Sequence, residues 1–227
     1  MTQQNYELQI DVVALKSALA RQRIMKPHFR LPLSAEQANE CLMAAIATEV
    51  ENRQRTLDIN EGLQKRVEKM ASWLTNEHGK QGMLLCGGCG NGKTTFIKAF
   101  RSLLNLLHVR NLYDNTIYGM RFMTAKDIVA LYRTNFKAWL DLANCTMLAI
   151  DDLGCEPTEI MDFGNVSNPI IDLLSIRYEE QLFTIISTNF KASDIRTKYG
   201  DRIADRLNEM VERIYFDNDS YRTDEYK

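Results

Sequence analysis

The stretch of residues 83–95, MLLCGGCGNGKTT, constrains the fold of this chain more than any other part of the sequence. Gly87 to Thr94 fit the pattern G-x-x-x-x-G-K-[ST], whose glycines let the main chain turn tightly and approach anionic oxygens. The apolar residues before them predict a strand, and the segment KTTFIKAFRSLLNLL after them predicts an amphipathic helix. Because the free amides at a helix N-terminus favour anions, this order of strand, loop and helix indicates a phosphate-binding loop.

The positions in this loop have distinct chemical roles in such a site. Lys93 would reach the outer phosphates of a nucleotide as a mobile positive charge, and the Thr94 hydroxyl would bind Mg²⁺. Thr95 would add a hydrogen bond to an inner phosphate. The residues expected to bind the nucleotide are Gly87, Gly88, Gly90, Asn91, Gly92, Lys93, Thr94 and Thr95.

The same stretch contains Cys86-x-x-Cys89, a spacing found in redox couples and metal sites. The predicted helix begins after both cysteines, and no second pair of thiols or histidines in the sequence lies at metal-ligand spacing. We therefore assign the loop to phosphates. Cys89 is still a candidate for redox sensitivity, because Lys93 and the helix amides would favour its thiolate, whose oxidation would block nucleotide binding.

The composition and charge of the chain exclude several classes of protein. The 227 residues, 45% of them apolar and 26% charged, suit one main soluble domain with a small appendage. No apolar run is long enough to span a bilayer and the polar N-terminus lacks the pattern of a secretion signal, so we expect a cytoplasmic protein with reduced cysteines. The formal net charge of −2 gives no general attraction to nucleic acid, so DNA binding would need a local basic patch.

From residue 80 onwards, short apolar runs alternate with amphipathic helical segments, which is typical of a parallel sheet covered by helices. Pro169 suits the first turn of its helix, where its missing amide hydrogen would have had no partner. The predicted fold class is a five-stranded α/β domain. We expect strands near residues 83–86, 121–124, 146–150, 183–187 and 212–216, and helices near 93–107, 125–142, 169–180 and 192–209.

The first 75 residues have a different character. Ser34 and Gln37 fit a capping box, which predicts a helix over about residues 35–54, and a second helix is expected near 61–76. Before them, Lys16 to Arg30 form a basic stretch that contains no acidic residue. This stretch is a candidate for contact with DNA phosphates. The family resemblance given below implies contact with a partner protein instead, which we prefer.

Two predicted strands end in polar residues at the same edge of the sheet. Asp151 and Asp152, which we call the acidic pair, follow the run MLAI, and Asn189 follows TIIST. Because the carboxyl ends of parallel strands face the ligand in such folds, Asp151 would hold Mg²⁺ and Asp152 would orient and polarise the attacking water. Asn189 would hold that water or the outer phosphate, although an asparagine after a strand is also common in ordinary turns.

Arg202 and Arg206 lie four residues apart, and so on one face of a predicted helix. Their acidic neighbours favour ordinary surface ion pairs of little energetic value. A second interpretation is that one of them is an arginine finger, which reaches the nucleotide bound by a neighbouring subunit. The active site would then be composite, and hydrolysis would require assembly.

Taken together, these motifs resemble those of the AAA+ ATPases of the DnaC-like helicase loaders and the similar IstB-like transposition ATPases. The resemblance covers roughly residues 60–227 and implies an AAA+ P-loop core with strand order 5-1-4-3-2, ATP and Mg²⁺ as cofactors, and a reduced or absent C-terminal lid. The motifs that carry it are LLCGGCGNGKTTF, FMTAKDIVALYRTNF, LAIDDLGCEP, IIDLLSIRYEEQLFTIISTNF, YGDRIADRLNEM and YFDNDSYR, in this order.

The resemblance also implies roles for single residues. It supports the phosphate and Mg²⁺ roles of the loop and the acidic pair, and it makes Asn189 the first sensor of nucleotide. Arg206 is then the expected finger, with Arg202 as its rival. Arg222 matches a position that senses nucleotide from the C-terminal side.

The function implied by the resemblance is ATP-dependent loading of a replicative DNA helicase onto single-stranded DNA, by a homo-oligomer that forms with ATP or DNA. Residues 1–60 would be a helical segment that binds the partner, and residues 61–227 the AAA+ ATPase domain. A helper of a transposase is the alternative within the same class. A non-hydrolysing nucleotide-binding scaffold or inhibitor is the alternative from another class, and the presence of both acidic residues and both candidate fingers argues against it.

Single-stranded DNA has candidate contacts after the second predicted strand. Lys126, Arg133 and Lys137 are interleaved there with Tyr132 and Phe136. Basic and aromatic side chains in this arrangement suit a surface that follows the phosphate backbone and stacks on bases. Aromatic residues at helical spacing are equally typical of a core, and for these two we prefer that interpretation.

Overall fold

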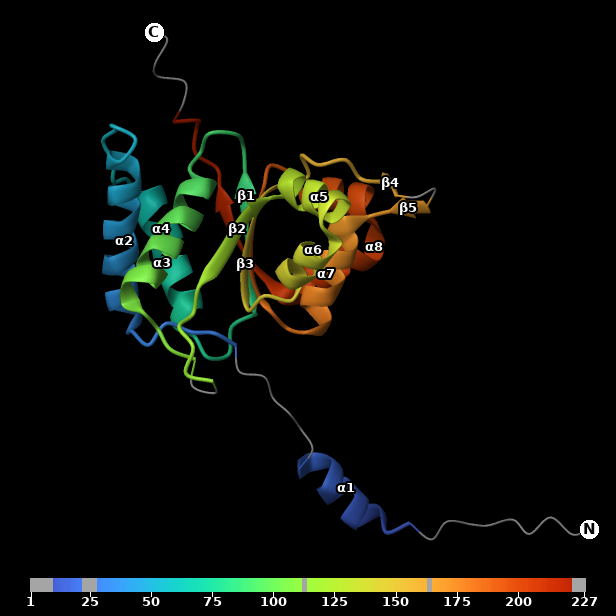
Figure 1. The fold of residues 1–227 in the computed structure, drawn as a ribbon. Helices are drawn as coiled ribbons and strands as arrows, with labels where there is room; N and C mark the ends of the chain where they lie inside the picture. The colour runs from blue at the N-terminus through green and yellow to red at the C-terminus, as the bar shows by residue number, and fades with distance from the viewer. Residues whose placement is uncertain (1–9, 22–27, 112–113, 163–164, 222–227) are drawn as a thin grey trace, which may run out of the picture.

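Five parallel strands form the centre of the molecule (Figure 1). The computed structural model describes residues 10–21, 28–111, 114–162 and 165–221. The sheet contains β1 (Gly82–Gly87), β2 (Met120–Thr124), β3 (Met147–Leu153), β6 (Phe183–Thr188) and β7 (Val211–Phe216), in the spatial order β2-β3-β6-β1-β7 with every neighbouring pair parallel. When these five strands are numbered 1 to 5 in chain order and read from the β7 edge, the order is 5-1-4-3-2, which confirms the predicted topology.

Helices cover both faces of this sheet, as Figure 1 shows. Because side chains on a strand point alternately to opposite faces, successive residues of β1 enter different cores. Met83 and Leu85 pack on the side of three helices, and Leu84 and Cys86 on the side of four. The first three helices are α2 (Ala35–Glu51), α3 (Glu61–Thr75) and α4 (Lys93–Leu107), and the other four are α5 (Ala125–Thr134), α6 (Phe136–Ala143), α7 (Pro169–Glu179) and α8 (Ala192–Met210).

Local capping signals set the ends of several helices. Ser34 and Gln37 form the predicted capping box at the start of α2, and Pro169 occupies the first turn of α7. The single helix expected over residues 125–142 is wrong, because the chain leaves the helical conformation at Asn135, with φ −154° and ψ 84°. Asn135 ends α5, and its side chain accepts a hydrogen bond from the Ala138 amide at the start of α6. Asparagine favours helix caps over helix interiors, which explains the break.

A buried arginine holds the amino ends of two strands in place. Arg177, on α7, is completely buried, and its guanidinium donates to the carbonyls of Ala143 and Cys145 at 3.0 and 2.9 Å. It also donates to the Phe183 carbonyl at 2.6 Å and to Thr184 Oγ1 at 2.8 Å. Burial lowers the pKa of Arg177 to about 10, so the side chain is still charged at neutral pH. Arg177 thus ties the connection between α6 and β3 to the start of β6.

The helices before the sheet have different surroundings. α2 packs against α3 and α4, and its residues Leu42 and Ile46 belong to the same core as the sheet. α1 (Val12–Arg21) has no buried residue. Arg30, from the basic stretch, donates to the main-chain oxygens of Asn76 and Gly79, which close the turn before β1. The division of the chain at residue 60 stays a prediction.

A short hairpin lies outside the main sheet. An antiparallel hairpin that the sequence did not predict, β4 (Ile160–Asp162) and β5 (Asn165–Ser167), lies between β3 and α7. None of the helices within residues 10–21, 28–111, 114–162 and 165–221 is long and apolar enough to cross a membrane.

Candidate active site

The loop between β1 and α4 has a main-chain conformation that requires glycine. A Cβ atom on Gly87 would collide with the main-chain oxygen of Phe216 and lie 2.6 Å from Nδ2 of Asn91. Gly92, directly before the first residue of α4, has φ 100°, a value that strains any residue with a Cβ. No described side chain caps α4, so the amides of its first turn are available to an anion.

Lys93 lies inside this loop and is only 5% exposed. Its Nζ donates to the carbonyls of Gly87 and Gly88 at 2.8 and 2.5 Å, and to Oδ1 of Asn91 at 3.0 Å. Burial lowers the pKa of Lys93, and the charges of Cys89 and the acidic pair oppose that shift. The ammonium group is therefore held at the centre of the loop by acceptors that a phosphate oxygen is able to replace.

The first turn of α4 meets the end of β3 through a hydroxyl and a carboxylate. Thr94 Oγ1 donates to Asp151, at 3.1 Å from each carboxylate oxygen. The Ser187 hydroxyl, on β6, donates to the same carboxylate, which is buried and needs such partners. The structure thus brings together the two residues predicted to hold Mg²⁺. Thr95 follows in the same turn of α4 and is buried.

Asp152 adopts a left-handed main-chain conformation, φ 55°, where β3 departs from regular pairing. The register between β3 and β6 shifts between Ile150 and Leu153, which indicates a β-bulge. The Asp152 amide donates to Ser187 Oγ at 2.9 Å, so Ser187 contacts both members of the acidic pair. The sequence interpretation preferred Asn189 at this strand end and gave Ser187 no role, although a serine at the end of an apolar strand was a visible signal.

Asn189 lies beside the phosphate-binding loop. Its Nδ2 donates a hydrogen bond to Cys89 Sγ at 3.2 Å, which joins the end of β6 to the middle of the loop. The two thiols of the C-x-x-C pair have different surroundings. Cys86 is buried in the core with α5 to α8, and burial raises its pKa, whereas Cys89 is exposed.

The chain that follows β7 also contacts the loop. Asn91 Nδ2 donates to the Phe216 carbonyl at 2.6 Å, and the Tyr221 amide donates to the Gly90 carbonyl at 3.0 Å. The Asn91 side chain therefore links the end of β7 to Lys93, because its Oδ1 also accepts a hydrogen bond from Lys93 Nζ. The predicted nucleotide sensor Arg222 comes directly after this segment and lies outside the described residues.

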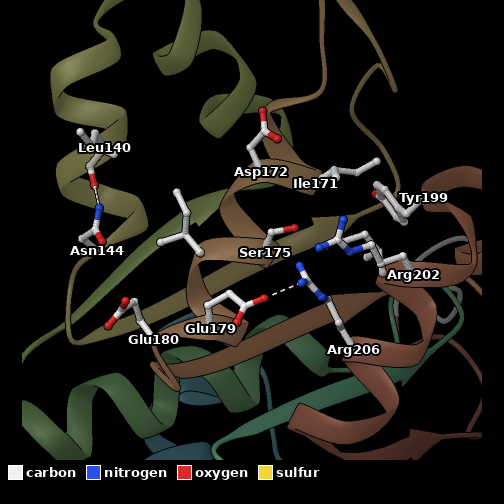
Figure 2. A pocket seen from close by; sticks show the side chains of 12 residues that line it. Leu140, Asn144, Ile171, Asp172, Ser175, Glu179, Glu180, Tyr199, Arg202 and Arg206 are labelled. Atoms are coloured by element: carbon white, nitrogen blue, oxygen red, sulfur yellow. Dashed lines mark hydrogen bonds and ion pairs between the residues drawn. The ribbon is translucent and has the colours of Figure 1, made fainter. Parts of the chain in front are cut away.

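Arg202 and Arg206 lie on α8 after a kink at Gly200, where φ is 81°. Figure 2 shows both arginines in a pocket that they share with residues of α6 and α7. Arg206 Nη2 lies 2.5 Å from Glu179 Oε1, and its guanidinium carbon lies 4.9 Å from the centre of the Tyr178 ring. No described residue of the phosphate-binding loop lines this pocket.

The residues at the end of β3 suit a magnesium ion. Thr94 and Asp151 offer oxygen ligands, which Mg²⁺ prefers, and they are already in contact. Within the part of the chain that the structure describes, no group of three or more His, Cys, Asp or Glu side chains could hold a metal ion. A magnesium ion here would therefore take its other ligands from a nucleotide and from water.

Comparisons with known proteins give matches to solved structures only. No protein-family model matches the sequence, and no curated protein sequence matches it. The crystal structure of the DnaC helicase loader has a TM-score of 0.54 with 21% identity, over 70% of this chain and 93% of the other. The crystal structure of DnaI has a TM-score of 0.55 with 20% identity, over 73% of this chain and 88% of the other.

At these identities the likeness concerns the fold, and it agrees with the geometry described above. The strand order, the helices on both faces and the loop between β1 and α4 form one consistent arrangement. The chain therefore shares its fold, a five-stranded parallel sheet with a glycine loop after β1, with the DnaC helicase loader and with DnaI.

Proposed function

We propose that the chain is a Mg²⁺-dependent ATPase that loads a replicative DNA helicase onto single-stranded DNA in the cytoplasm. The observation that carries the proposal is the contact of Thr94 with Asp151, beside the Lys93 ammonium inside its glycine loop. A cation, a metal-binding hydroxyl and a carboxylate at one sheet edge are the groups that binding of a nucleoside triphosphate with Mg²⁺ requires.

Each residue has a defined task in ATP hydrolysis. Lys93 binds the outer phosphates, and Thr94 with Asp151 holds the metal, which when bound neutralises negative charge on the phosphate oxygens. Asp152, whose side chain is exposed beside this site, accepts a hydrogen bond from the attacking water and orients it. Asn189 donates from its amide to that water or to the outer phosphate.

The test of the ATPase is the substitution Asp152→Asn. We expect ATP to bind with nearly unchanged affinity while kcat falls by about 100-fold, because a positioned acid–base group contributes at least that much. Asp141→Asn, at an exposed position on α6, is the matched control and should leave both values unchanged. If the wild-type chain binds ATP without DNA-stimulated hydrolysis, and Lys93→Ala still supports function, a non-hydrolysing scaffold is the correct assignment.

Helicase loading is supported by the solved structures of DnaC and DnaI and by the surface of α1. Val12, Leu15 and Leu19 are 56%, 47% and 55% exposed and recur at helical spacing, so they form an apolar stripe. An exposed amphipathic helix of this kind suits docking to another protein.

Partner capture tests this assignment directly. The full chain with ATP should retain a replicative helicase, and the double substitution Leu15→Asp, Leu19→Asp should abolish that retention. Val13→Asp, on another side of α1, is the control. Retention of a transposase in place of the helicase would show that the chain is a transposition helper, and retention of neither at saturating ATP would refute both assignments.

The α5–α6 junction is the proposed contact for single-stranded DNA. Phe136 is 54% exposed, and its ring stacks on Trp139 at a centroid distance of 5.5 Å, with Tyr132 at 5.3 Å. Lys126, Arg133 and Lys137 are exposed on the same two helices. An exposed ring held by other rings and surrounded by cations favours base stacking over a purely structural role.

The substitution Phe136→Ala tests this surface. We expect affinity for a single-stranded oligonucleotide to fall about tenfold, since one base loses its stacking partner. Tyr215→Ala, which removes a 61% exposed ring on β7, is the control. Equal losses in both variants would contradict a specific DNA surface at the α5–α6 junction.

We also propose that the active site is completed by a second copy of the chain. Arg206 and Arg202 line the pocket between α6, α7 and α8, to which the phosphate-binding loop of their own chain contributes no described residue, so we expect either to act on nucleotide bound by a neighbour. Lys93→Ala and Arg206→Ala chains should each be inactive alone and regain ATPase activity when mixed. If Arg202→Ala complements Lys93→Ala and Arg206→Ala hydrolyses ATP normally, Arg202 is the finger. If the specific ATPase activity of the wild type and of either arginine variant does not depend on protein concentration, the proposed assembly is contradicted.

A further inference from the structure

The segment after the acidic pair leaves regular strand geometry in two places. Asp152 has φ 55° and Gly154 has φ 108°, both in the left-handed region. A Cβ atom on Gly154 would lie 2.8 Å from the Phe190 ring, so a larger residue does not fit there. Because such conformations persist only where the surroundings impose them, residues 152–156 require partners that hold them.

One partner is the carboxylate of Glu156, which is 3% exposed. Its Oε2 accepts a hydrogen bond from the Gly154 amide at 2.9 Å, and its Oε1 accepts one from the Tyr199 hydroxyl. Burial, and then the contact with Glu156, raise the pKa of Tyr199, so this hydroxyl stays protonated and continues to donate. The Cys155 amide adds a 3.1 Å hydrogen bond to the Asp152 carbonyl, which closes a turn directly before Glu156.

Lys198, on α8, contacts the same turn, because its side chain donates to main-chain carbonyls there. Its Nζ lies 3.3 Å from Glu156 Oε1 and donates to the Gly154 carbonyl at 2.6 Å and to the Glu156 carbonyl. A buried carboxylate is costly unless it is paired and hydrogen-bonded, and here it is both. Glu156 is therefore the point where the turn after the acidic pair and helix α8 hold each other.

We propose that Glu156 is a positioning residue that makes the location of Asp152 depend on α8. Tyr199 and Lys198 lie directly before the kink at Gly200, and the two candidate fingers follow it on the same helix. When a neighbouring chain moves α8, the hydrogen bonds at Glu156 transmit that movement to the water-orienting carboxylate. The proposal rests on the ATPase function proposed above and adds the regulation of its site.

Amide hydrogen exchange tests the dependence on α8 without requiring ATP hydrolysis. In the full chain, Tyr199→Phe should make the amides of residues 152–156 exchange about tenfold faster, because Glu156 loses a fixed donor. Tyr178→Phe is the matched control, since it removes a hydroxyl that bonds Glu209 on α8 at 2.5 Å on an exposed surface. The control should leave exchange in residues 152–156 at the wild-type rate.

Enzyme kinetics provide the second measurement. Glu156→Gln and Lys198→Met should each lower kcat about tenfold and change the ATP dissociation constant less than twofold, because they displace Asp152 and leave the phosphate-binding loop intact. Thermal unfolding of each variant identifies any that fail to fold. If only Glu156→Gln fails to fold, the exchange rates measured in Tyr199→Phe decide whether Glu156 is a positioning residue.

The two proposals fail in different ways. Wild-type chain without ATPase activity, combined with faster exchange in Tyr199→Phe, would remove the ATPase and keep the coupling between α8 and residues 152–156. Normal ATPase activity, combined with unchanged exchange and unchanged kcat in Tyr199→Phe, would refute the positioning role of Glu156. An equal rise of exchange throughout the chain would also refute it, because Tyr199 would then support only global stability.

Discussion

Two cations are buried at opposite ends of the same sheet, and their partners are chemically alike. Arg177 donates to main-chain carbonyls and one hydroxyl at the amino ends of the strands. Lys93 donates to two main-chain carbonyls and one side-chain oxygen at the carboxyl end of β1. Both pKa values are lowered by burial, that of Arg177 to about 10. The hydrogen-bonding chemistry alone therefore does not separate a structural cation from one that we propose binds phosphate.

The difference lies in where the acceptors come from. Arg177 joins acceptors from two other parts of the chain, up to 34 residues away, with a rigid planar group that matches fixed positions. Lys93 joins acceptors that are two to six residues away, all within its own loop, with a flexible point charge. Removal of Arg177 thus separates elements of the fold, whereas removal of Lys93 changes one loop and its ligand.

The largest expected effect in this comparison is that of Arg177→Met. Several buried acceptors lose their donor at once, so the free energy of unfolding should fall by about 3–5 kcal/mol. Urea unfolding followed by circular dichroism measures this change. Nucleotide affinity should be unchanged at temperatures where the variant is folded, and a stability within 1 kcal/mol of wild type would contradict the bracing role.

The converse is expected for Lys93→Met. ATP affinity should fall roughly 100-fold because charge-assisted bonds to the phosphates are lost, while stability changes by less than about 1 kcal/mol. Calorimetric titration and urea unfolding measure the two quantities. Lys80→Met is the matched control, because Lys80 also donates to main-chain carbonyls, those of Asn208 and Val211, away from the loop. A stability loss equal to that of Arg177→Met would remove the distinction between the two cations.

Ser187→Ala sharpens the comparison at the end of the sheet where the candidate site lies. Loss of the hydroxyl removes one of the two described donors to the Asp151 carboxylate and leaves the Asp152 amide without its Ser187 partner, so kcat should fall about tenfold with ATP affinity nearly unchanged. Ser102→Ala removes a similar serine–carboxylate bond, to Glu49, at a distant site and serves as the control. Equal rates in both variants would show that Ser187 is not needed to position the acidic pair.

The smallest expected effect is on the pH dependence of ATP binding. Burial lowers the pKa of Lys93 in the free chain, and bound phosphate would stabilise its charged form, so affinity should weaken a few-fold as pH rises through that lowered value. Folding stability should change in the opposite sense, rising between the lowered pKa and the ordinary value of 10.5, because the unfolded chain binds more protons there. Lys93→Met should show neither contribution in calorimetry or in urea unfolding.

Much of the fold followed from local patterns in the sequence. Alternating apolar runs located the five strands of the parallel sheet, and the glycine pattern located the loop between β1 and α4. The helix predicted over residues 125–142 was wrong because Asn135 caps two helices, and apolar periodicity continues through such a break. The β4–β5 hairpin was missed because its strands have only three residues each, too few for a periodic signal.

The candidate site was predictable where its residues are neighbours in sequence. Lys93 and Thr94 belong to one contiguous motif, and Asp151 with Asp152 ends one strand, so residue types and spacing were sufficient to select them. Ser187 received no role, because its contacts with the acidic pair exist only across the bulged pairing of β3 and β6. Glu156 and Tyr199, 43 residues apart, gave no joint signal for the same reason.

By itself, then, the sequence determined the order of elements, the strand edge that carries the ligand groups, and the loop that would bind phosphate. These follow from periodicity and from the conformational range of glycine, which act over a few residues. The tertiary structure alone decided that Arg177 joins two strand starts while Lys93 lies inside the glycine loop, that Ser187 contacts both members of the acidic pair, and that Glu156 joins the turn after that pair to α8. Those roles depend on strand register and side-chain direction, which arise only when distant segments pack together.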